Sequence, residues 1–164
     1  MMTTDTAQKF LARSIELAMA NVLNSGGPFG AVVVTADGQV FDGVNRVTAT
    51  NDPTAHAEVT AIRRACSELG TFDLSGATLY CSCEPCPMCL ASALWARVSR
   101  VVFAADRHDA ASAGFDDAVF YEYFENDQRD ALMPVGRLEL TGPDAPGAMD
   151  PFNAWNSLES RTEY

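Results

Sequence analysis

Three residues that commonly bind zinc, together with one carboxylate, fall in two short stretches of the sequence. Glu58 follows His56 by two positions, and Cys86 and Cys89 lie three positions apart. One histidine nitrogen and two thiolates fill three positions of a tetrahedral zinc site and leave the fourth open for water, as in catalytic sites. Because zinc lowers the pKa of a bound water to about 7, this pattern predicts a catalytic zinc centre that supplies hydroxide at neutral pH.

Glu58 is the acid/base group of this hypothesis. Its carboxylate would accept the proton of the water, pass it to a ring nitrogen and then protonate a leaving amine, with ammonia as the co-product. The spacing H-x-E followed by P-C-x-x-C is typical of zinc-dependent nucleobase deaminases. The two motifs therefore predict a reaction class, the hydrolysis of an aminated heterocycle.

A closed structural site is the alternative interpretation of the same cysteines. Cys83 precedes Cys86 by three residues, as Cys86 precedes Cys89, and could supply a fourth zinc ligand. Bound zinc would then stabilise a non-catalytic binding domain by an amount on the order of 10 kcal/mol. Glu58 would have no water to activate in such a site, whereas the open site gives each of these residues a role.

The elements that position these residues follow from hydrophobic periodicity and from turn residues. The helix expected over residues 53–69 has Asp52 as its cap, Pro53 at its first position and Gly70 at its end, so His56 and Glu58 lie in its first turns. Pro87 is expected to begin a second helix, to about residue 97. Cys86 and Cys89 then lie at a helix N-terminus, where the helix dipole favours thiolates.

The remaining elements predict one α/β domain with a sheet covered by helices on both faces. A hairpin turn at Asp37-Gly38 joins two antiparallel strands, and a strand, helix, strand unit over residues 77–104 predicts a parallel pair with a right-handed crossover. The expected helices cover residues 6–24, 53–69, 87–97, 116–126 and 151–160. The expected strands cover residues 31–35, 40–47, 77–82, 98–104 and 135–140.

The charge of the chain argues against a nucleic acid partner. The 164 residues include 11 basic and 22 acidic side chains, so the formal net charge is 11 minus 22, or −11. Such a surface repels a polyanion. A solvated acidic surface with no functional meaning explains the charge equally simply.

The expected location is the cytoplasm. The N-terminal sequence has no basic leader with an apolar core, and no run approaches the roughly 18 apolar residues that span a bilayer. The five cysteines are an odd number, and four of them fall within residues 81–89. This clustering favours metal binding under reducing conditions over a set of disulfides.

Four segments resemble bacterial guanine deaminases of the cytidine deaminase superfamily. They are residues 26–30 (GGPFG), 51–59 (NDPTAHAEV), 82–89 (SCEPCPMC) and 113–117 (AGFDD). The similarity covers nearly the whole chain. It implies a single domain over residues 1–164 with a three-layer α/β/α fold and a central mixed sheet of five strands. It also implies Zn²⁺ as cofactor and the conversion of guanine to xanthine and ammonia.

The same resemblance implies a set of substrate contacts. Asn45 and Asp117 would bond to the purine edge, with Phe29 and Trp95 against its apolar surface. Plainer roles remain for each: Asn45 could satisfy backbone groups at a strand end, Asp117 could cap the following helix, and Phe29 and Trp95 could be core residues.

A homodimer is the last implication of the resemblance. Residues 141–164, a connector and a tail helix, would cross to the partner and close its active site, placing Tyr164 near the base. Simple packing within one chain, with a frayed tail, is the alternative. A tRNA adenosine deaminase, or a deaminase of a pterin, a triazine or isocytosine, shares the zinc chemistry and remains a rival.

Overall fold

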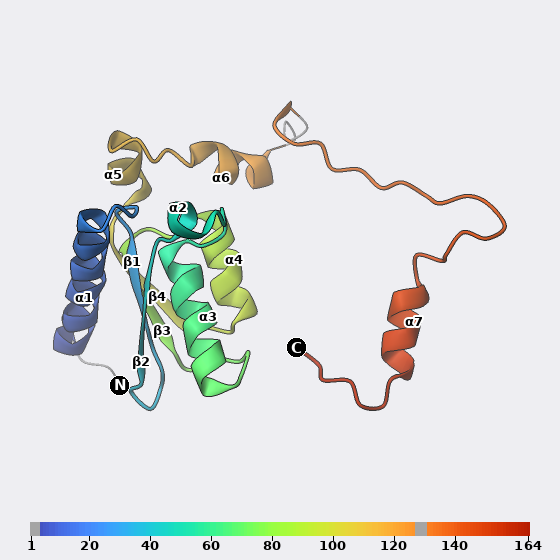
Figure 1. Cartoon of the computed structure of the whole chain (residues 1–164), viewed down its shortest axis with the longest axis horizontal. Coiled ribbons are helices and arrows are strands. Elements are labelled where there is room, and N and C mark those ends of the chain that lie inside the picture. Colours follow the sequence, from blue (N-terminus) through green and yellow to red (C-terminus); the bar gives the residue numbers. More distant parts are fainter. Residues whose placement is uncertain (1–3, 127–130) are drawn as a thin grey trace. The chain divides into compact units, whose positions relative to one another are not determined.

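The computed structural model describes residues 4–126 and 131–164. The chain divides into two compact units, Met1–Glu125 and Asn126–Tyr164. The first unit holds the sheet and most of the helices, whereas the described residues of the second unit form one helix and long irregular segments (Figure 1).

A mixed sheet of four strands forms the centre of the first unit, in the order β2-β1-β3-β4. The strands are β1 (Gly30–Val34), β2 (Val40–Val44), β3 (Thr78–Cys83) and β4 (Arg100–Ala105). As predicted, β1 pairs antiparallel with β2, and β3 pairs parallel with β4 across the helical crossover. The antiparallel pairing of β1 with β3 joins the two halves.

The predicted fifth strand is wrong. Residues 135–140 have no regular structure, and Val135, Leu138 and Leu140 are 70%, 87% and 65% exposed. Alternating apolar residues form a strand only where a neighbouring edge pairs with the backbone and a core covers one face. Residues 135–140 form no such pairing in the structure, and the sheet has four strands.

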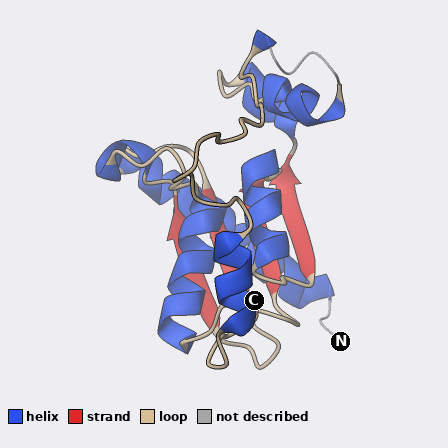
Figure 2. Ribbon diagram, turned by 90° about the vertical axis from the view of Figure 1, so that its right-hand side faces the viewer, coloured by secondary structure: helices blue, strands red, loops and turns tan. Residues whose placement is uncertain are grey.

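Helices cover both faces of this sheet, as the sequence predicts (Figure 2). The side chains of β1 alternate: Ala31 and Val33 pack in the larger core with α3 (Ala57–Leu69). Val32 and Val34 pack in the smaller core, whose other members include Phe10 of α1 (Thr4–Leu23). The three-layer α/β/α arrangement is therefore confirmed.

The remaining helices are short. They are α2 (Val47–Thr50), α4 (Pro87–Trp95), α5 (Arg107–Ser112), α6 (Ala118–Glu125) and, in the second unit, α7 (Asp150–Ser157). The sequence analysis missed α2, which begins where a strand was expected to continue. The expected helices also did not include α5, although Asp106 and Asp109 form a capping box at its start.

The helix that carries Glu58 begins later than predicted. Its N-cap is His56, not Asp52. The Asp52 carboxylate instead accepts hydrogen bonds from the backbone N–H of Thr54 at 2.8 Å and from its hydroxyl at 2.6 Å. This local turn competes with helix formation, so residues 53–55 approach the helix without joining it.

Two glycines allow helices to lie directly on the sheet. A Cβ on Gly43 of β2 would meet the carbonyl oxygen of Ala57 at 2.3 Å and the nitrogen of Ala61 at 2.4 Å. A Cβ on Gly30 of β1 would meet the carbonyl oxygen of Ser14 at the same distance, 2.3 Å. The Gly43 contact sets the height of α3, and with it Glu58, above the strands.

Within the described residues, no helix is long and apolar enough to cross a membrane.

We expect Gly43→Ala to lower the free energy of unfolding by about 1–3 kcal/mol, because the added methyl meets backbone atoms that cannot move independently of α3. Gly136→Ala is the matched control, since a Cβ there meets no atom within 4 Å, and we expect a change within about 0.5 kcal/mol. Urea denaturation followed by circular dichroism measures both. Equal stability of the two variants would contradict the close packing of α3 on β2.

Candidate active site

The predicted metal ligands come from the N-termini of two neighbouring helices. His56 is the N-cap of α3 and Cys86 is the N-cap of α4, both with extended backbone angles and neither with a side-chain cap hydrogen bond. Pro87 occupies the first turn of α4 and fixes the direction in which the helix leaves Cys86. Cys89 lies three residues further on, on the same side of this first turn.

The three side chains converge on one point. The His56 Nδ1 atom lies 3.7 Å from Cys86 Sγ and 3.5 Å from Cys89 Sγ. All three ligand atoms lie within 4.8 Å of one another. A tetrahedral ion with Zn–N near 2.0 Å and Zn–S near 2.3 Å requires ligand atoms about 3.5–3.8 Å apart. The donor set and its spacing therefore fit zinc, with Nδ1 as the histidine ligand atom.

The electrostatics of this group favour a cation. The hydrogen bond from Cys89, together with the contact to His56, lowers the pKa of the Cys86 thiol to about 4. The same contact with Cys86 raises the pKa of Cys89, so the two sulfurs share one proton. The Cys86 contact also raises the pKa of His56. A thiolate therefore lies at the shared point at neutral pH, and a zinc ion would displace the remaining protons.

Glu58 lies in the first turn of α3, beside the metal ligands. It is only 7% exposed, and burial raises the pKa of its carboxyl group. A buried carboxyl with a raised pKa holds its proton to higher pH than an exposed carboxyl and can release it to a nearby acceptor. This environment suits the acid/base role that the sequence predicts.

Cys83 does not belong to the ligand group. In the part of the chain that the structure describes, the only cluster of metal-binding side chains consists of His56, Cys86 and Cys89. The Cys83 Sγ lies 3.6 Å from the carbonyl oxygen of Asp106, and burial raises the pKa of its thiol to about 11. Cys83 therefore stays a neutral thiol in the wall of the site, which favours three protein ligands over a closed set of four.

A cavity of about 370 Å³ opens beside this group. Glu58, His56 and Cys86 line its floor, and the predicted substrate residues Phe29, Asn45 and Asp117 also line it. The Phe29 ring meets the Phe115 ring edge to face, with centroids 5.0 Å apart. A flat apolar ligand would therefore have an aromatic wall on one side and polar groups around its edge.

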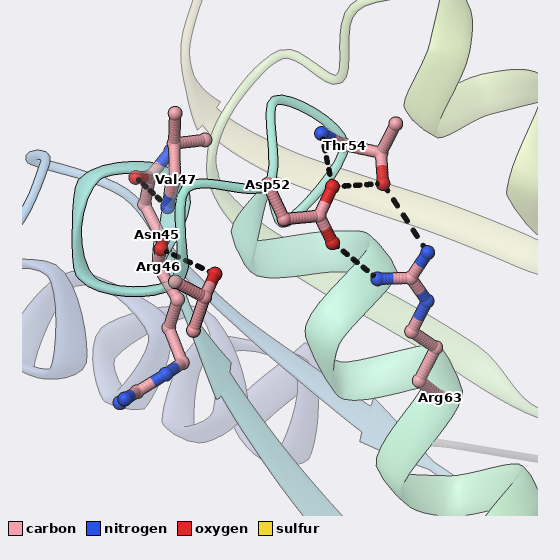
Figure 3. A network of polar contacts seen from close by, with 7 residues as sticks. Asn45, Arg46, Val47, Asp52, Thr54 and Arg63 are labelled. Carbon is pink, nitrogen blue, oxygen red and sulfur yellow. Dashed lines mark hydrogen bonds and ion pairs between the residues drawn. The ribbon is translucent and has the colours of Figure 1, made fainter.

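Asn45 directly follows β2 and is held by its backbone. Its N–H donates to the carbonyl of Phe29 at 3.1 Å, and its own carbonyl accepts from the Asn21 side chain at 2.9 Å. The side-chain oxygen accepts from the N–H of Val47 at 3.3 Å (Figure 3). Asn45 thus satisfies a backbone group, as its plainer interpretation predicts, and also lines the cavity.

A second polar network holds the segment that leads to His56. Arg63 of α3 donates to the Asp52 carboxylate at 3.1 Å and to the Thr54 hydroxyl at 3.2 Å (Figure 3). Because the Asp52 carboxylate also holds Thr54, residues 52–54 are tied to the second turn of α3. These bonds fix the direction from which the chain enters His56.

The carboxylate that holds the start of α6 belongs to Asp116. Its side chain accepts the N–H of Ala118 at 3.0 Å. Asp116 and Asp117 both line the cavity, and burial, followed by the negative charge of Cys86, raises the pKa of the Asp117 carboxyl group. Because the capping bond comes from Asp116, the substrate-facing interpretation of Asp117 is favoured over the capping one.

The structure does not bring Trp95 to this cavity. Trp95 is 69% exposed at the end of α4 and lines a separate hollow with Ala91, Leu94 and Arg97. This exposure also contradicts the plainer interpretation of Trp95 as a core residue. Tyr164 belongs to the second unit, where its ring lies edge to face with Trp155 at 6.2 Å.

The sequence analysis overlooked two charged residues of the cavity wall, Glu84 and Arg107. Glu84 stands between the motif cysteines and could have been noticed for that reason. Arg107 had no signal of its own, although the capping box formed by Asp106 and Asp109 would have placed it at the start of a helix.

Comparison with known proteins agrees with this geometry. Residues 4–105 match the cytidine and deoxycytidylate deaminase zinc-binding region. The chain is 45% identical to the guanine deaminase of Bacillus subtilis over 158 residues, 96% of this chain and 98% of that protein. The solved structure of a Bacillus subtilis guanine deaminase superposes with a TM-score of 0.87 at 46% identity, over 96% and 98% of the two chains.

Two further relatives are shorter matches. A solved structure in complex with 2,6-diaminopurine is 36% identical, with a TM-score of 0.63, over 67% of this chain and 62% of that one. A tRNA-specific adenosine deaminase of Agrobacterium fabrum is 41% identical over 95 residues, 56% of this chain and 62% of that protein. The chain belongs to the zinc-dependent cytidine and deoxycytidylate deaminase family. Within that family, its similarity to the Bacillus subtilis guanine deaminase extends over nearly the full length of both chains.

We expect Cys86→Ser and Cys89→Ser each to lose stoichiometric zinc, because each removes one of three protein ligands. Cys83→Ser is the matched control and should retain one zinc per chain, since its sulfur lies outside the ligand group. Metal content after gel filtration, measured by mass spectrometry, distinguishes the two cases. Loss of zinc from the Cys83 variant alone would support the closed site instead.

Proposed function

We propose that this protein hydrolyses the exocyclic amine at C2 of guanine, releasing xanthine and ammonia. One observation carries the proposal: a ligand group that fits zinc and a buried Glu58 open into one cavity lined by aromatic and acidic side chains. The likeness to the Bacillus subtilis guanine deaminase over 96% of the chain supports guanine as the substrate.

His56, Cys86 and Cys89 are the proposed zinc ligands. When bound, zinc makes hydroxide available near neutral pH by lowering the pKa of water to about 7. Glu58 would accept the first proton of that water and deliver it to a ring nitrogen, and it would then pass the second proton, released from the added hydroxyl group, to the departing amine. The buried position of Glu58 keeps this proton from exchanging freely with solvent.

Asn45, Asp117 and Phe29 are the proposed purine contacts. Guanine presents N–H donors along its edge, and the Asp117 carboxylate accepts such bonds, whereas the Asn45 amide can both donate and accept. Phe29 offers an apolar surface to the ring, supported from behind by Phe115. A cavity of about 370 Å³ matches a small bicyclic base.

A tRNA adenosine deaminase is the main rival, supported by the shorter match to the Agrobacterium fabrum enzyme. The formal charge of −11 and the acidic cavity residues Glu84, Asp116 and Asp117 oppose RNA binding. A free purine carries no phosphates and meets no such repulsion.

The free thiols at all five cysteines support the proposed cytoplasmic location.

Glu58→Gln should reduce guanine turnover at least 100-fold while one zinc per chain is retained, because an amide cannot carry the proton. Glu16→Gln is the matched control, since it removes an exposed carboxylate outside the cavity; it should keep turnover within about two-fold. Ammonia release coupled to ultraviolet spectra measures both. Full turnover by a zinc-replete Glu58 variant would disprove the proposed role.

The substrate itself is tested by offering guanine, guanosine, adenine, cytosine and cytidine to the zinc-replete protein. We expect rapid conversion of guanine alone, because a ribose would have to fit within a cavity that a closing tail reduces further. Comparable turnover of guanosine would refute the preference for the free base. Ammonia release from none of them would favour another aminated heterocycle or RNA.

We further infer a homodimer in which residues 141–164 of one subunit cover the cavity of the other and bring Tyr164 to the base. The apolar face of α7 supports this arrangement, because Phe152, Trp155 and Leu158 are 61%, 38% and 48% exposed. A helix of eight residues is not stable alone and needs a surface on which to pack. Exposed Trp95 is available to contact a second subunit.

Deletion of residues 161–164 should lower kcat/KM for guanine at least ten-fold, because the cavity would lose its cover and Tyr164. The Glu163→Gln variant, which keeps the tail, is the control and should retain turnover within about two-fold. Steady-state kinetics measures the effect, and light scattering reports whether both proteins are dimers. Unchanged kinetics of the shortened chain would remove the role of the tail as a lid.

A further inference from the structure

The segment between β3 and α4, residues 84–86, is fastened to two helices that lie far from it in the sequence. The Tyr121 hydroxyl of α6 donates a hydrogen bond to the Pro85 carbonyl at 3.0 Å. The backbone N–H of Arg107, at the start of α5, donates to the Glu84 carboxylate at 3.0 Å. The two bonds hold the two residues that directly precede Cys86.

Arg107 and Tyr121 are also joined to each other. The Arg107 guanidinium carbon lies 4.6 Å from the centroid of the Tyr121 ring, within the range of a cation–π interaction. This stack restrains the ring from which the hydroxyl reaches Pro85. Burial, followed by the nearby negative charges of Asp117, Glu84 and Cys86, raises the pKa of Tyr121 to about 12. The phenol therefore stays protonated and remains a donor.

The position of the Pro85 carbonyl affects the metal group directly. Pro85 is fully buried, and its carbonyl belongs to the peptide that leads to Cys86. Cys86 has no side-chain cap hydrogen bond of its own. Partners outside the metal ligands typically change metal affinity or activity by about 10–100-fold when removed. Tyr121 is such an outer partner of Cys86, because its hydroxyl bonds to the carbonyl of the peptide that joins Pro85 to Cys86.

The same two helices frame the substrate side of the cavity. Asp117 stands one residue before α6, and Arg107 itself lines the cavity. One set of contacts therefore joins a metal ligand to the wall that carries Asp117. A shift of about 1 Å in the metal ligand or in the wall can lower the rate on the order of 100-fold. Contacts that hold both in place therefore serve the function of the site.

We propose that Tyr121 and Arg107 are positioning residues that hold the Cys86 segment and the α5–α6 wall in one fixed geometry. The expected effect of these residues on guanine turnover rests on the proposed function. Their expected effect on zinc binding does not depend on the substrate. Neither side chain takes part in proton transfer.

The test uses Tyr121→Phe, which keeps the ring and its stack with Arg107 and removes only the bond to Pro85. We expect about ten-fold weaker zinc binding in competition with a chelator, and an altered thiolate charge-transfer band in the cobalt-substituted protein. At saturating zinc, kcat for guanine should fall about five-fold with KM changed less than two-fold. Arg107→Met should give about a three-fold loss of zinc affinity, and Arg107→Lys should restore most of it.

The double variant should lose less than the product of the two single effects, because both residues act through one contact. Tyr123→Phe on the same helix and Arg64→Met on the outer side of α3 are the controls, since neither lines the cavity. Zinc affinity and cobalt spectra equal to wild type in Tyr121→Phe would overturn the proposal, even if its melting temperature fell. Absence of guanine turnover by the wild-type protein would refute the proposed function, whereas the two metal measurements would still decide this proposal.

Discussion

The convergence of two helix N-termini on one point is the constraint on which the rest of this structure depends. His56 and Cys86 are both N-cap residues, and Cys89 lies within the first turn of the same helix as Cys86. Two N-termini so close together place partial positive charges side by side, which is unfavourable without an anion between them. The Cys86 thiolate supplies negative charge at that point, because the hydrogen bond from Cys89 and the contact with His56 lower its pKa. The N-termini of α3 and α4 are held in position by the sheet, by the close approach of α3 to Gly43 and by the buried Pro85.

Charge is distributed unevenly around this centre. The cavity is lined by Glu58, Glu84, Asp116 and Asp117, with Arg107 and His56 as the basic residues. Burial raises the pKa values of Glu58 and Asp117, so each carboxyl holds a proton more readily than an exposed one. A divalent cation would reverse part of this effect by stabilising the anionic forms. The site is therefore arranged for proton exchange next to a cation, and a neutral base rich in N–H donors fits it better than a phosphate-bearing polymer.

Much of the fold and the ligand set could be predicted because local sequence determines them. The hairpin at Asp37-Gly38, the strand, helix, strand unit and the spacing of His56, Cys86 and Cys89 all depend on residues near one another in the chain. The failures have tertiary causes. Residues 135–140 alternate like a strand but pair with no strand of the sheet. The turn at Asp52 delays α3 through a side-chain bond that competes with helix formation. The resemblance implies a purine contact for Trp95, yet its side chain is 69% exposed at the end of α4.

The cavity wall shows most clearly why spacing alone is insufficient. Arg107 and Tyr121 carry no motif, and their importance appears only when α5 and α6 fold back over residues 84–86. In this chain the metal ligands come from α3 and α4, whereas Asp117 comes from a later segment that must be held at a set distance. The contacts of Arg107 and Tyr121 with residues 84 and 85 join the metal ligands to the cavity wall and meet this requirement. Neither side chain takes part in the reaction itself. Closely similar zinc motifs can therefore serve different substrates, because the segments after β4 set the shape of the pocket, while the motifs set only the chemistry.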